Sequence, residues 1–196
     1  MVINGIFSYK SYVDKDSIEI IKKDAGEYKY RYLLSVNFTD ASSIERPLVV
    51  IMKNPSCADE NNSDRTVNNI LKFAHENNYT KVHILNLYSL YSTDSKKIKY
   101  LVNGDKKLVA VGEDNDKVIK ETIENVEDII IAWGTSPKGM KRSYKERVEE
   151  VLRFFKDKNL YYVLEDYHES LYPRHPQVWA SDAADLKLEP WNGGSN

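Results

Sequence analysis

The sequence contains one cysteine, Cys57, and this scarcity excludes two kinds of stabilisation. A single thiol cannot form an internal disulfide, and no CxxC or Cys/His spacing predicts structural zinc. Long apolar runs are missing too: none approaches the roughly 20 residues that a membrane-spanning helix needs, and residues 1–10 lack the pattern of a signal peptide. We therefore expect a soluble, cytoplasmic protein with no membrane partner, no metal site and no cofactor.

A large excess of charge of one sign is also absent. The chain has 28 lysines and arginines against 30 aspartates and glutamates, for a net charge of −2. No global positive field exists to bind a polyanion by releasing counterions, so a nucleic-acid partner is not favoured and would need a local basic patch. At 196 residues and 41% hydrophobic content, the chain fits a single domain over residues 1–192, with a disordered tail at 193–196.

The N-terminal part of the chain has the pattern of β-structure. An apolar run at residues 18–21 and alternating residues at 28–38 predict an antiparallel hairpin within an N-terminal extension, residues 1–40. The chain has 14 tyrosines, several of them alternating along Tyr28 to Tyr32. A half-exposed sheet face is favoured for this run, and a platform for stacking bases stays open as the alternative. Whether the hairpin mediates a homodimer is left open.

After the hairpin, strands and helices alternate over a core of residues 41–180. Continuous apolar runs predict four buried strands, at residues 48–52, 82–85, 128–132 and 160–164. Apolar residues at helical spacing predict three amphipathic helices, near residues 67–74, 118–126 and 144–155. Residues 91–112 predict an exposed excursion. The expected fold is α/β: a three-layer α/β/α sandwich around a central four-stranded, mainly parallel sheet, with the N-terminal antiparallel β-hairpin added.

Polar residues follow each predicted strand, at the edge where ligands bind in parallel sheets. In chain order they are Lys53, Asn54, Pro55 and Ser56 after the first strand, Asn86 and Tyr88 after the second, Trp133 and Gly134 after the third, and His175 beyond the fourth. Pro55 forces Asn54 toward an extended conformation and holds its amide at a bend beside the expected pocket; a plain turn is the alternative. Histidine suits proton transfer or stabilisation of an oxyanion, and an isolated surface His-Pro pair is the alternative for His175.

The other strand-end residues also have structural interpretations. Asn86 could bind a ligand or hydrogen-bond a neighbouring loop. Trp133 and Gly134 could offer an aromatic plate and close backbone approach, or Trp133 could be a core residue. The side chain of Lys53 could face the pocket or the solvent.

Asp64, Arg65 and Thr66 lie where the first helix should begin and face the pocket. A helix N-terminus attracts phosphate or carboxylate, and Arg65 could add a bidentate contact, although capping alone explains Asp64. No Walker loop, GxGxxG, GxSxG or paired-histidine metal helix is present. The common phosphate, esterase and metalloprotease sites are therefore not predicted.

An ordered set of motifs gives the chain a resemblance to a known family. The motifs are Arg31-Tyr32, Ile51 to Asp59, Asp64 to Val67, Asn86 to Ser89, Gly112 to Asp116, Ala132 to Gly134 and His175-Pro176. From about Tyr30 to Val178 the sequence is similar to the bacterial and phage family called domain of unknown function sixteen-forty-three. The resemblance implies a fold and a site, but it brings no assigned reaction.

A more distant resemblance is to the uracil-DNA glycosylase superfamily, whose members place an Asn-Pro or Asp-Pro motif after the first core strand and a His-Pro motif after the last. That likeness implies that Asn54 positions the attacking water and that His175 stabilises the oxygen of the leaving base, with Trp133 or a tyrosine stacked on the base. Two departures stand out: Lys53 precedes Asn54, and Gln177-Val178 replace a serine-containing continuation. They put a duplex-intercalating loop in doubt.

Three functions are consistent with these observations. The leading hypothesis is a glycosylase-like pocket that binds a nucleobase- or nucleotide-derived small molecule, either sequestering a signalling nucleotide in phage counter-defence or hydrolysing it. The alternative is a DNA base glycosylase that flips a base into the pocket. The third is a protein-binding adaptor, although interspersed charges disfavour a DNA mimic. Whether the protein is an enzyme stays open; an enzyme would be an N-glycosidic-bond hydrolase with Asn54 and His175 as catalytic residues.

Overall fold

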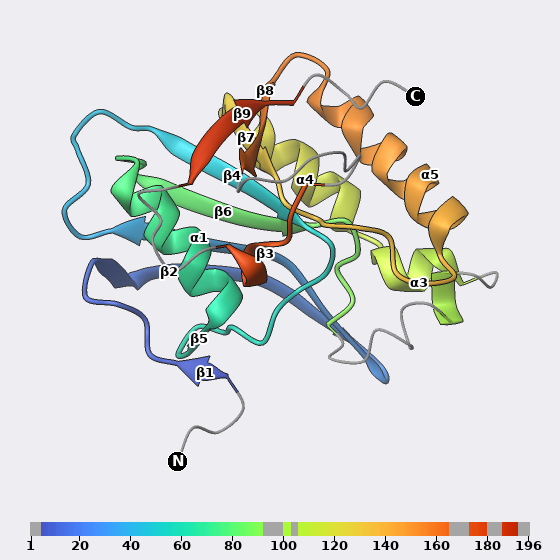
Figure 1. Cartoon of the computed structure of the whole chain (residues 1–196). Coiled ribbons are helices and arrows are strands. Elements are labelled where there is room, and N and C mark those ends of the chain that lie inside the picture. Colours follow the sequence, from blue (N-terminus) through green and yellow to red (C-terminus); the bar gives the residue numbers. More distant parts are fainter. Residues whose placement is uncertain (1–4, 92–99, 103–105, 165–172, 180–185, 192–196) are drawn as a thin grey trace.

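The computed structural model describes residues 5–91, 100–102, 106–164, 173–179 and 186–191. A seven-stranded mixed sheet lies at its centre, in the order β2-β3-β6-β4-β7-β8-β9, and β1 and β5 form a second, two-stranded sheet (Figure 1). The described strands are β1 (Ile6–Phe7), β2 (Val13–Ala25), β3 (Tyr28–Phe38), β4 (Pro47–Met52), β5 (Ser63–Asp64), β6 (Lys81–Asn86), β7 (Asp128–Ile131), β8 (Asn159–Leu164) and β9 (Lys187–Pro190). The described helices are α1 (Arg65–Glu76), α3 (Lys107–Val111), α4 (Asn115–Ile123) and α5 (Lys141–Leu152), with 3-10 turns η1 (Arg153–Phe155) and η2 (Pro176–Val178).

The centre of the large sheet consists of β6, β4, β7 and β8, which pair in parallel. These strands coincide with the four apolar runs of the sequence. Because both faces of the sheet are covered, Leu48–Met52 of β4 is buried throughout. The sheet is larger than predicted, since antiparallel strands extend it to seven, with β3 beside β6 and β9 beside β8.

The predicted N-terminal hairpin is present as β2 and β3, which pair from Val13 opposite Phe38 to Ala25 opposite Tyr28. β3 also pairs with β6, so the hairpin forms one edge of the main sheet. The sequence does not predict β9, because the residues Lys-Leu-Glu-Pro have the composition of a loop. They become a strand by pairing with β8, a contact that local sequence does not encode.

Two tyrosines of β3 correct the interpretation of the tyrosine run. Tyr30 and Tyr32 are 8% and 2% exposed, and their rings stack with centroids 5.9 Å apart. They pack in a core cluster with Val102, Val111 and other residues that follow β6. For these two residues, a half-exposed sheet face and a base-stacking platform are therefore both wrong, because the chain after β6 covers this part of the sheet.

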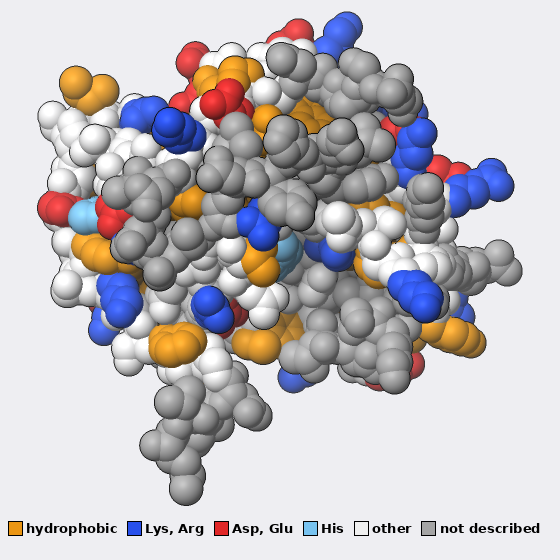
Figure 2. All heavy atoms as spheres, in the orientation of Figure 1, with side chains coloured by type: hydrophobic (Ala, Val, Ile, Leu, Met, Phe, Trp, Pro, Cys, Tyr) orange, Lys and Arg blue, Asp and Glu red, His pale blue; other side chains and the backbone are white. Residues whose placement is uncertain are grey.

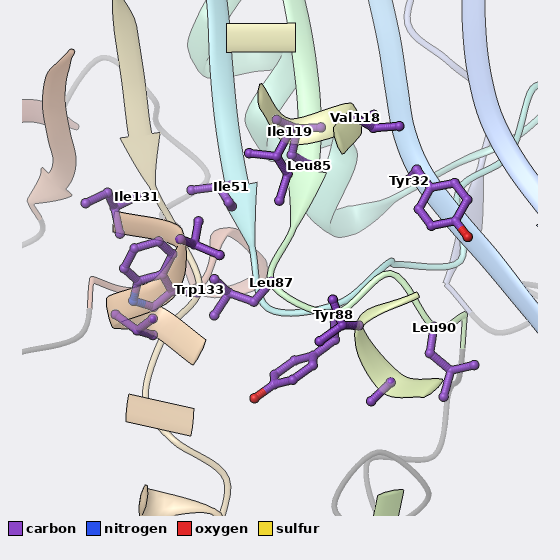
Figure 3. Packing of buried hydrophobic residues seen from close by; sticks show 14 of the residues in the cluster. Tyr32, Ile51, Leu85, Leu87, Tyr88, Leu90, Val118, Ile119, Ile131 and Trp133 are labelled. Atoms are coloured by element: carbon purple, nitrogen blue, oxygen red, sulfur yellow. The ribbon is translucent and has the colours of Figure 1, made fainter. Parts of the chain in front are cut away.

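Helices pack on both faces of the sheet (Figure 1). Side chains alternate along β4, so Leu48, Val50 and Met52 pack with α1, whereas Val49 and Ile51 pack with α4 and α5. Figure 3 shows the second of these two clusters. Burial of each such aliphatic side chain stabilises the fold by about 2 kcal/mol. Because a shift of one residue would turn these side chains to the opposite face, the alternation fixes which face of the sheet each residue at a strand end occupies.

Residues 91–112 are not simply an exposed excursion. Leu101, Val102, Ala110 and Val111 are all buried, and the last two belong to α3. The prediction is wrong at these positions because the segment contains two lysine pairs and an Asn-Gly-Asp turn sequence, and its apolar residues fall into short pieces. The rest of the excursion, and the tail predicted at 193–196, lie outside the described residues.

The helices of the described ranges include none that is long and apolar enough to cross a membrane.

Candidate functional site

A cleft with a volume of about 980 Å³ opens where β4 ends and α1 begins. The described residues that line it are Gly5, Phe7, Lys53, Asn54, Pro55, Ser56, Cys57, Asp64, Arg65, Thr66, Pro137, Lys138, His175 and Gln177. Most of the predicted ligand-binding residues therefore meet at one place. Figure 2 shows the face that carries α1 and η2, with basic side chains (blue) around its centre and acidic ones (red) mainly toward its edges.

Three side chains from outside the loop after β4 hold its backbone in place. Asp64 Oδ2 accepts from the Ala58 N–H (2.9 Å), the Arg31 guanidinium donates to the Ala58 carbonyl, and the Tyr9 hydroxyl donates to the Asp59 carbonyl (2.7 Å). Arg31 is only 3% exposed, so desolvation lowers its pKa. The charge of Arg31 thus serves to anchor this loop, which fixes one wall of the cleft.

Asn54 and Pro55 turn the chain out of β4. Pro55 is buried, and the Asn54 side-chain amide donates to the Pro55 carbonyl (3.2 Å). No hydrogen bond to the side-chain oxygen of Asn54 is made by the described residues, and Asn54 lines the cleft. This oxygen is therefore available to a ligand or to water.

Asp64, Arg65 and Thr66 place the N-terminus of α1 at the cleft. Asp64 is the N-cap: its Oδ1 accepts from the Val67 N–H (2.9 Å) while its other oxygen holds the Ala58 N–H, so both oxygens have structural roles. Arg65 is exposed and has no ion-pair partner in the part of the chain that the structure describes. Thr66 is 7% exposed and lines the cleft, and no described residue hydrogen-bonds its hydroxyl.

His175 reaches the cleft because α1 anchors the His-Pro segment. Asn69 Nδ2 of α1 donates to the Pro176 carbonyl (2.8 Å), and the buried Trp179 packs edge-on against Phe73 with ring centroids 5.6 Å apart. From the other side, Gly134 has φ +68°, and a Cβ atom there would lie 3.3 Å from the Cβ of His175. The predicted close approach at Gly134 is therefore an approach of His175.

Burial, with the nearby Lys53 ammonium as a second cause, lowers the pKa of His175 to about 4. The imidazole is thus neutral at pH 7. Its Nδ1 accepts from the Gln177 N–H (3.2 Å), so the proton of the neutral ring is on Nε2. His175 therefore offers the cleft a neutral N–H donor.

Lys53 lies in the cleft wall rather than in open solvent. Its Nζ donates to the Thr135 carbonyl (2.7 Å) and lies 5.6 Å from the centre of the Tyr144 ring. Partial burial lowers the pKa of Lys53. With no carboxylate beside it among the described residues, its charge contributes directly to the potential of the cleft.

Asn86, Tyr88 and Trp133 do not line the described cleft. All three are 0% exposed. Tyr88 and Trp133 lie on the α4 and α5 side of the sheet, where Figure 3 shows them packed with Leu87. Asn86 pairs with Met52 and so shares the α1 face with it, but it is buried there. The side-chain amide of Asn86, the Tyr88 hydroxyl and the Trp133 indole N–H have no hydrogen-bond partner within the described ranges. The structure thus places these three residues in the core and not in the wall of the cleft.

The cleft also includes residues that sequence reasoning misses. Three of them adjoin predicted site segments and could have been found by position: Gln177 follows His175-Pro176, Lys138 follows the Trp-Gly segment, and Cys57 extends the Asn-Pro-Ser segment. Phe7 carries no local signal, because the pairing of β1 with β5 alone brings it to the cleft.

Within the described ranges, no group of three histidine, cysteine, aspartate or glutamate residues is placed to hold a metal ion.

Comparison with protein families finds a match to residues 31–177, by a family model described as Protein of unknown function (DUF1643). No curated protein and no solved structure matches the chain. The matched range begins at Arg31 and ends at Gln177, so it contains the loop after β4, the start of α1 and His175. It leaves out Phe7 and the strand that carries it.

Proposed function

The chain belongs to the DUF1643 family, and we propose that its cleft binds a nucleobase- or nucleotide-derived small molecule. One observation carries the proposal: a cleft of about 980 Å³ is lined by a neutral imidazole (His175), an amide (Asn54) and a basic helix N-terminus (Arg65 and Thr66). The volume is at the upper end for small-molecule sites, which span roughly 300–1,000 Å³. Two kinds of polar group, neutral and cationic, suit the two parts of a nucleotide.

The start of α1 would bind the phosphate. The N–H groups of Arg65 and Thr66, in the first turn, have no acceptor within the helix, and the helix dipole favours an anion there. Thr66 is 7% exposed and lines the cleft, and its hydroxyl has no partner among described residues. Arg65 supplies a guanidinium that no described carboxylate neutralises.

The base would lie toward His175 and Asn54. The Nε2–H of His175 is a donor for a carbonyl oxygen, and the free side-chain oxygen of Asn54 is an acceptor for an N–H group or a water. A donor and an acceptor on one wall are the minimum needed to read the edge of a base.

This arrangement allows sequestration or hydrolysis of the ligand. In hydrolysis, a water oriented by Asn54 attacks the anomeric carbon, the bond from that carbon to the base nitrogen breaks, and the bonding electrons move onto the base. The water loses a proton to solvent as it becomes the sugar hydroxyl, and the base anion takes up a proton from solvent. The base oxygen that gains charge then accepts from the neutral His175, whose donor is pre-oriented by Gln177. The parallel arrangement of β6, β4, β7 and β8 supports our further proposal that the fold is a variant of the uracil-DNA glycosylase architecture.

Occupancy of the cleft can be measured through Cys57, which is exposed, lines the cleft and is the sole cysteine of the chain. Nucleosides, nucleotides and NAD-derived compounds that bind should slow alkylation of Cys57 and raise the melting temperature. His175→Ala should weaken both effects at least tenfold in ligand concentration for every compound that binds, and Arg65→Ala should do so for the compounds that carry a phosphate. Arg142→Ala, at a 93% exposed side chain on α5, is the control and should change neither.

If none of these compounds protects Cys57 or shifts the melting temperature, the proposal is wrong. Turnover is followed by chromatography of released base, from the bound compound and from oligonucleotides containing uracil or hypoxanthine. Release from oligonucleotides alone would favour the DNA glycosylase alternative.

A further inference from the structure

The N-terminal segment contributes an aromatic ring to the cleft. β1 pairs with β5 in antiparallel register, with Ile6 opposite Asp64 and Phe7 opposite Ser63. This pairing places β1 beside the residues that lead directly into α1. Phe7 lines the cleft and is 42% exposed, whereas its neighbour Ile6 is 46% exposed and does not line it.

Among the described residues that line the cleft, Phe7 is the one phenylalanine, tyrosine or tryptophan. Trp133 and Tyr88 are 0% exposed, so neither has a free face. Among the described lining residues, His175 carries the other aromatic ring, and the proposed function uses its Nε2–H as an in-plane hydrogen-bond donor to the base rather than its face. A flat apolar face beside charged and amide groups is the surface on which a heteroaromatic ring stacks.

We propose that Phe7 is the stacking surface for the ring of the bound molecule, and that it makes the cleft specific for ligands with a planar heteroaromatic group. This inference rests on the proposed function and names its substrate class. Phe7 lies outside residues 31–177, so a segment N-terminal to the family-matched range completes the site. A sugar phosphate without a base would use the α1 subsite and leave Phe7 uncovered.

The test compares two probes, a nucleoside 5′-monophosphate and ribose 5-phosphate, by calorimetry and by protection of Cys57. Phe7→Ala should weaken nucleoside monophosphate binding about tenfold or more and leave ribose 5-phosphate binding unchanged. Phe7→Trp should restore the nucleotide affinity, and Phe7→Leu, which keeps apolar area without a ring, should restore only part of it.

Ile6→Ala is the matched control, because Ile6 has similar exposure on the same strand but faces away from the cleft. It should change neither affinity. Equal effects of Ile6→Ala and Phe7→Ala, or nucleotide binding that Phe7→Ala leaves intact, would overturn the inference while the proposed function stands. If the wild-type chain binds no nucleotide at all, the proposed function fails and this inference fails with it.

Discussion

Two groups of polar residues lie near the carboxyl ends of the central strands and have different surroundings. Lys53, Arg65 and His175, here called the open group, line the cleft beside the start of α1. Asn86, Tyr88 and Trp133, the sealed group, are 0% exposed, Asn86 on the α1 face and the other two toward α4 and α5. Their difference shows that burial by neighbouring elements, and not position near a strand end alone, decides whether a side chain can meet a ligand.

The two sides also differ in how charge is balanced. Near the sealed group, the 1% exposed Arg147 donates to the Leu87 carbonyl (2.9 Å) and pairs with Asp116 and Glu150. In the open group, Lys53 and Arg65 have no carboxylate partner among the described residues. Uncompensated charge at an open surface favours an anionic ligand, whereas compensated charge in the core favours stability.

Substitution of a glycine on the sealed side should have the largest effect. Gly112 has φ +86°, and a Cβ atom there would lie 2.3 Å from Ser89 Oγ and 2.9 Å from the Tyr32 ring, both buried. We predict that Gly112→Ala lowers the free energy of unfolding by about 4 kcal/mol, through left-handed backbone strain and overpacking together. Urea denaturation measures this loss.

The control for this prediction is Gly26→Ala in the β2–β3 turn. Gly26 has φ +62° and nothing within 4 Å of the added atom, so backbone strain alone applies, at about 1 kcal/mol. If the two substitutions lower the free energy of unfolding by similar amounts, the residues around Gly112 must move to accommodate the added methyl group, and the packing there is less rigid than the structure indicates.

The arginines of the two sides form the next comparison. Arg147→Met should destabilise the protein by about 2–3 kcal/mol, because the Leu87 carbonyl and the two carboxylates lose a donor, although the half-exposed carboxylates can regain water. Arg65→Met should change the free energy of unfolding by less than about 0.5 kcal/mol, since its side chain is exposed. A larger loss at Arg65 than at Arg147, in the same denaturation series, would reverse the comparison.

The sequence predicts the open side better than the sealed one. β4, α1 and the Asp64 cap follow from local signals, namely an apolar run, helical spacing and a capping carboxylate. Trp133 shows what local sequence cannot predict. An aromatic residue that follows a buried strand has the same local sequence pattern whether it packs in the core or lines a pocket. What buries it is packing from α5, where the Tyr144 hydroxyl donates to the Trp133 carbonyl (3.0 Å).

Long-range contacts explain the other failures. Phe7 reaches the cleft through a two-residue pairing between β1 and β5, too short to leave a periodic pattern. β9 likewise depends on β8 for its conformation. Such contacts are properties of the folded chain, and neither composition nor spacing within the segment encodes them.

Acid should destabilise both sides of the sheet through one histidine each. Burial, with a nearby lysine as the second cause, lowers the pKa of His83 and of His175 to about 4. Between pH 6.5 and 4 the unfolded chain therefore binds protons that the folded chain does not, so stability is full above pH 6.5 and falls as pH decreases through this window. After discounting for solvent, each histidine should contribute about 1–2 kcal/mol to this loss.

Lys53→Met separates the two histidines. It removes the cation beside His175 and should raise the pKa of that imidazole, while the pKa of His83, whose lysine neighbour is Lys81, stays in place. NMR titration of the ring protons measures both. If the pKa values of His83 and His175 both rise in Lys53→Met, the substitution changes the fold as a whole and not only the electrostatic potential inside the cleft.

The smallest effect is expected at Asn86, and it tests whether the sealed group is sealed. Its side-chain amide is buried and neither of its atoms is hydrogen-bonded to a described residue, so Asn86→Leu, of similar volume, should leave stability unchanged or raise it by up to about 1 kcal/mol. Asn115→Leu is the matched control: the Asn115 amide donates to the Asn86 carbonyl (3.0 Å), and its loss should cost about 1–2 kcal/mol.

Nucleotide affinity should not change in Asn86→Leu. If the Asn86→Leu protein is stable but no longer binds nucleotide, the ligand must extend past the cleft into the buried region around Asn86. The polar atoms of Asn86, Tyr88 and Trp133 that have no partner among the described residues would then form hydrogen bonds with the ligand.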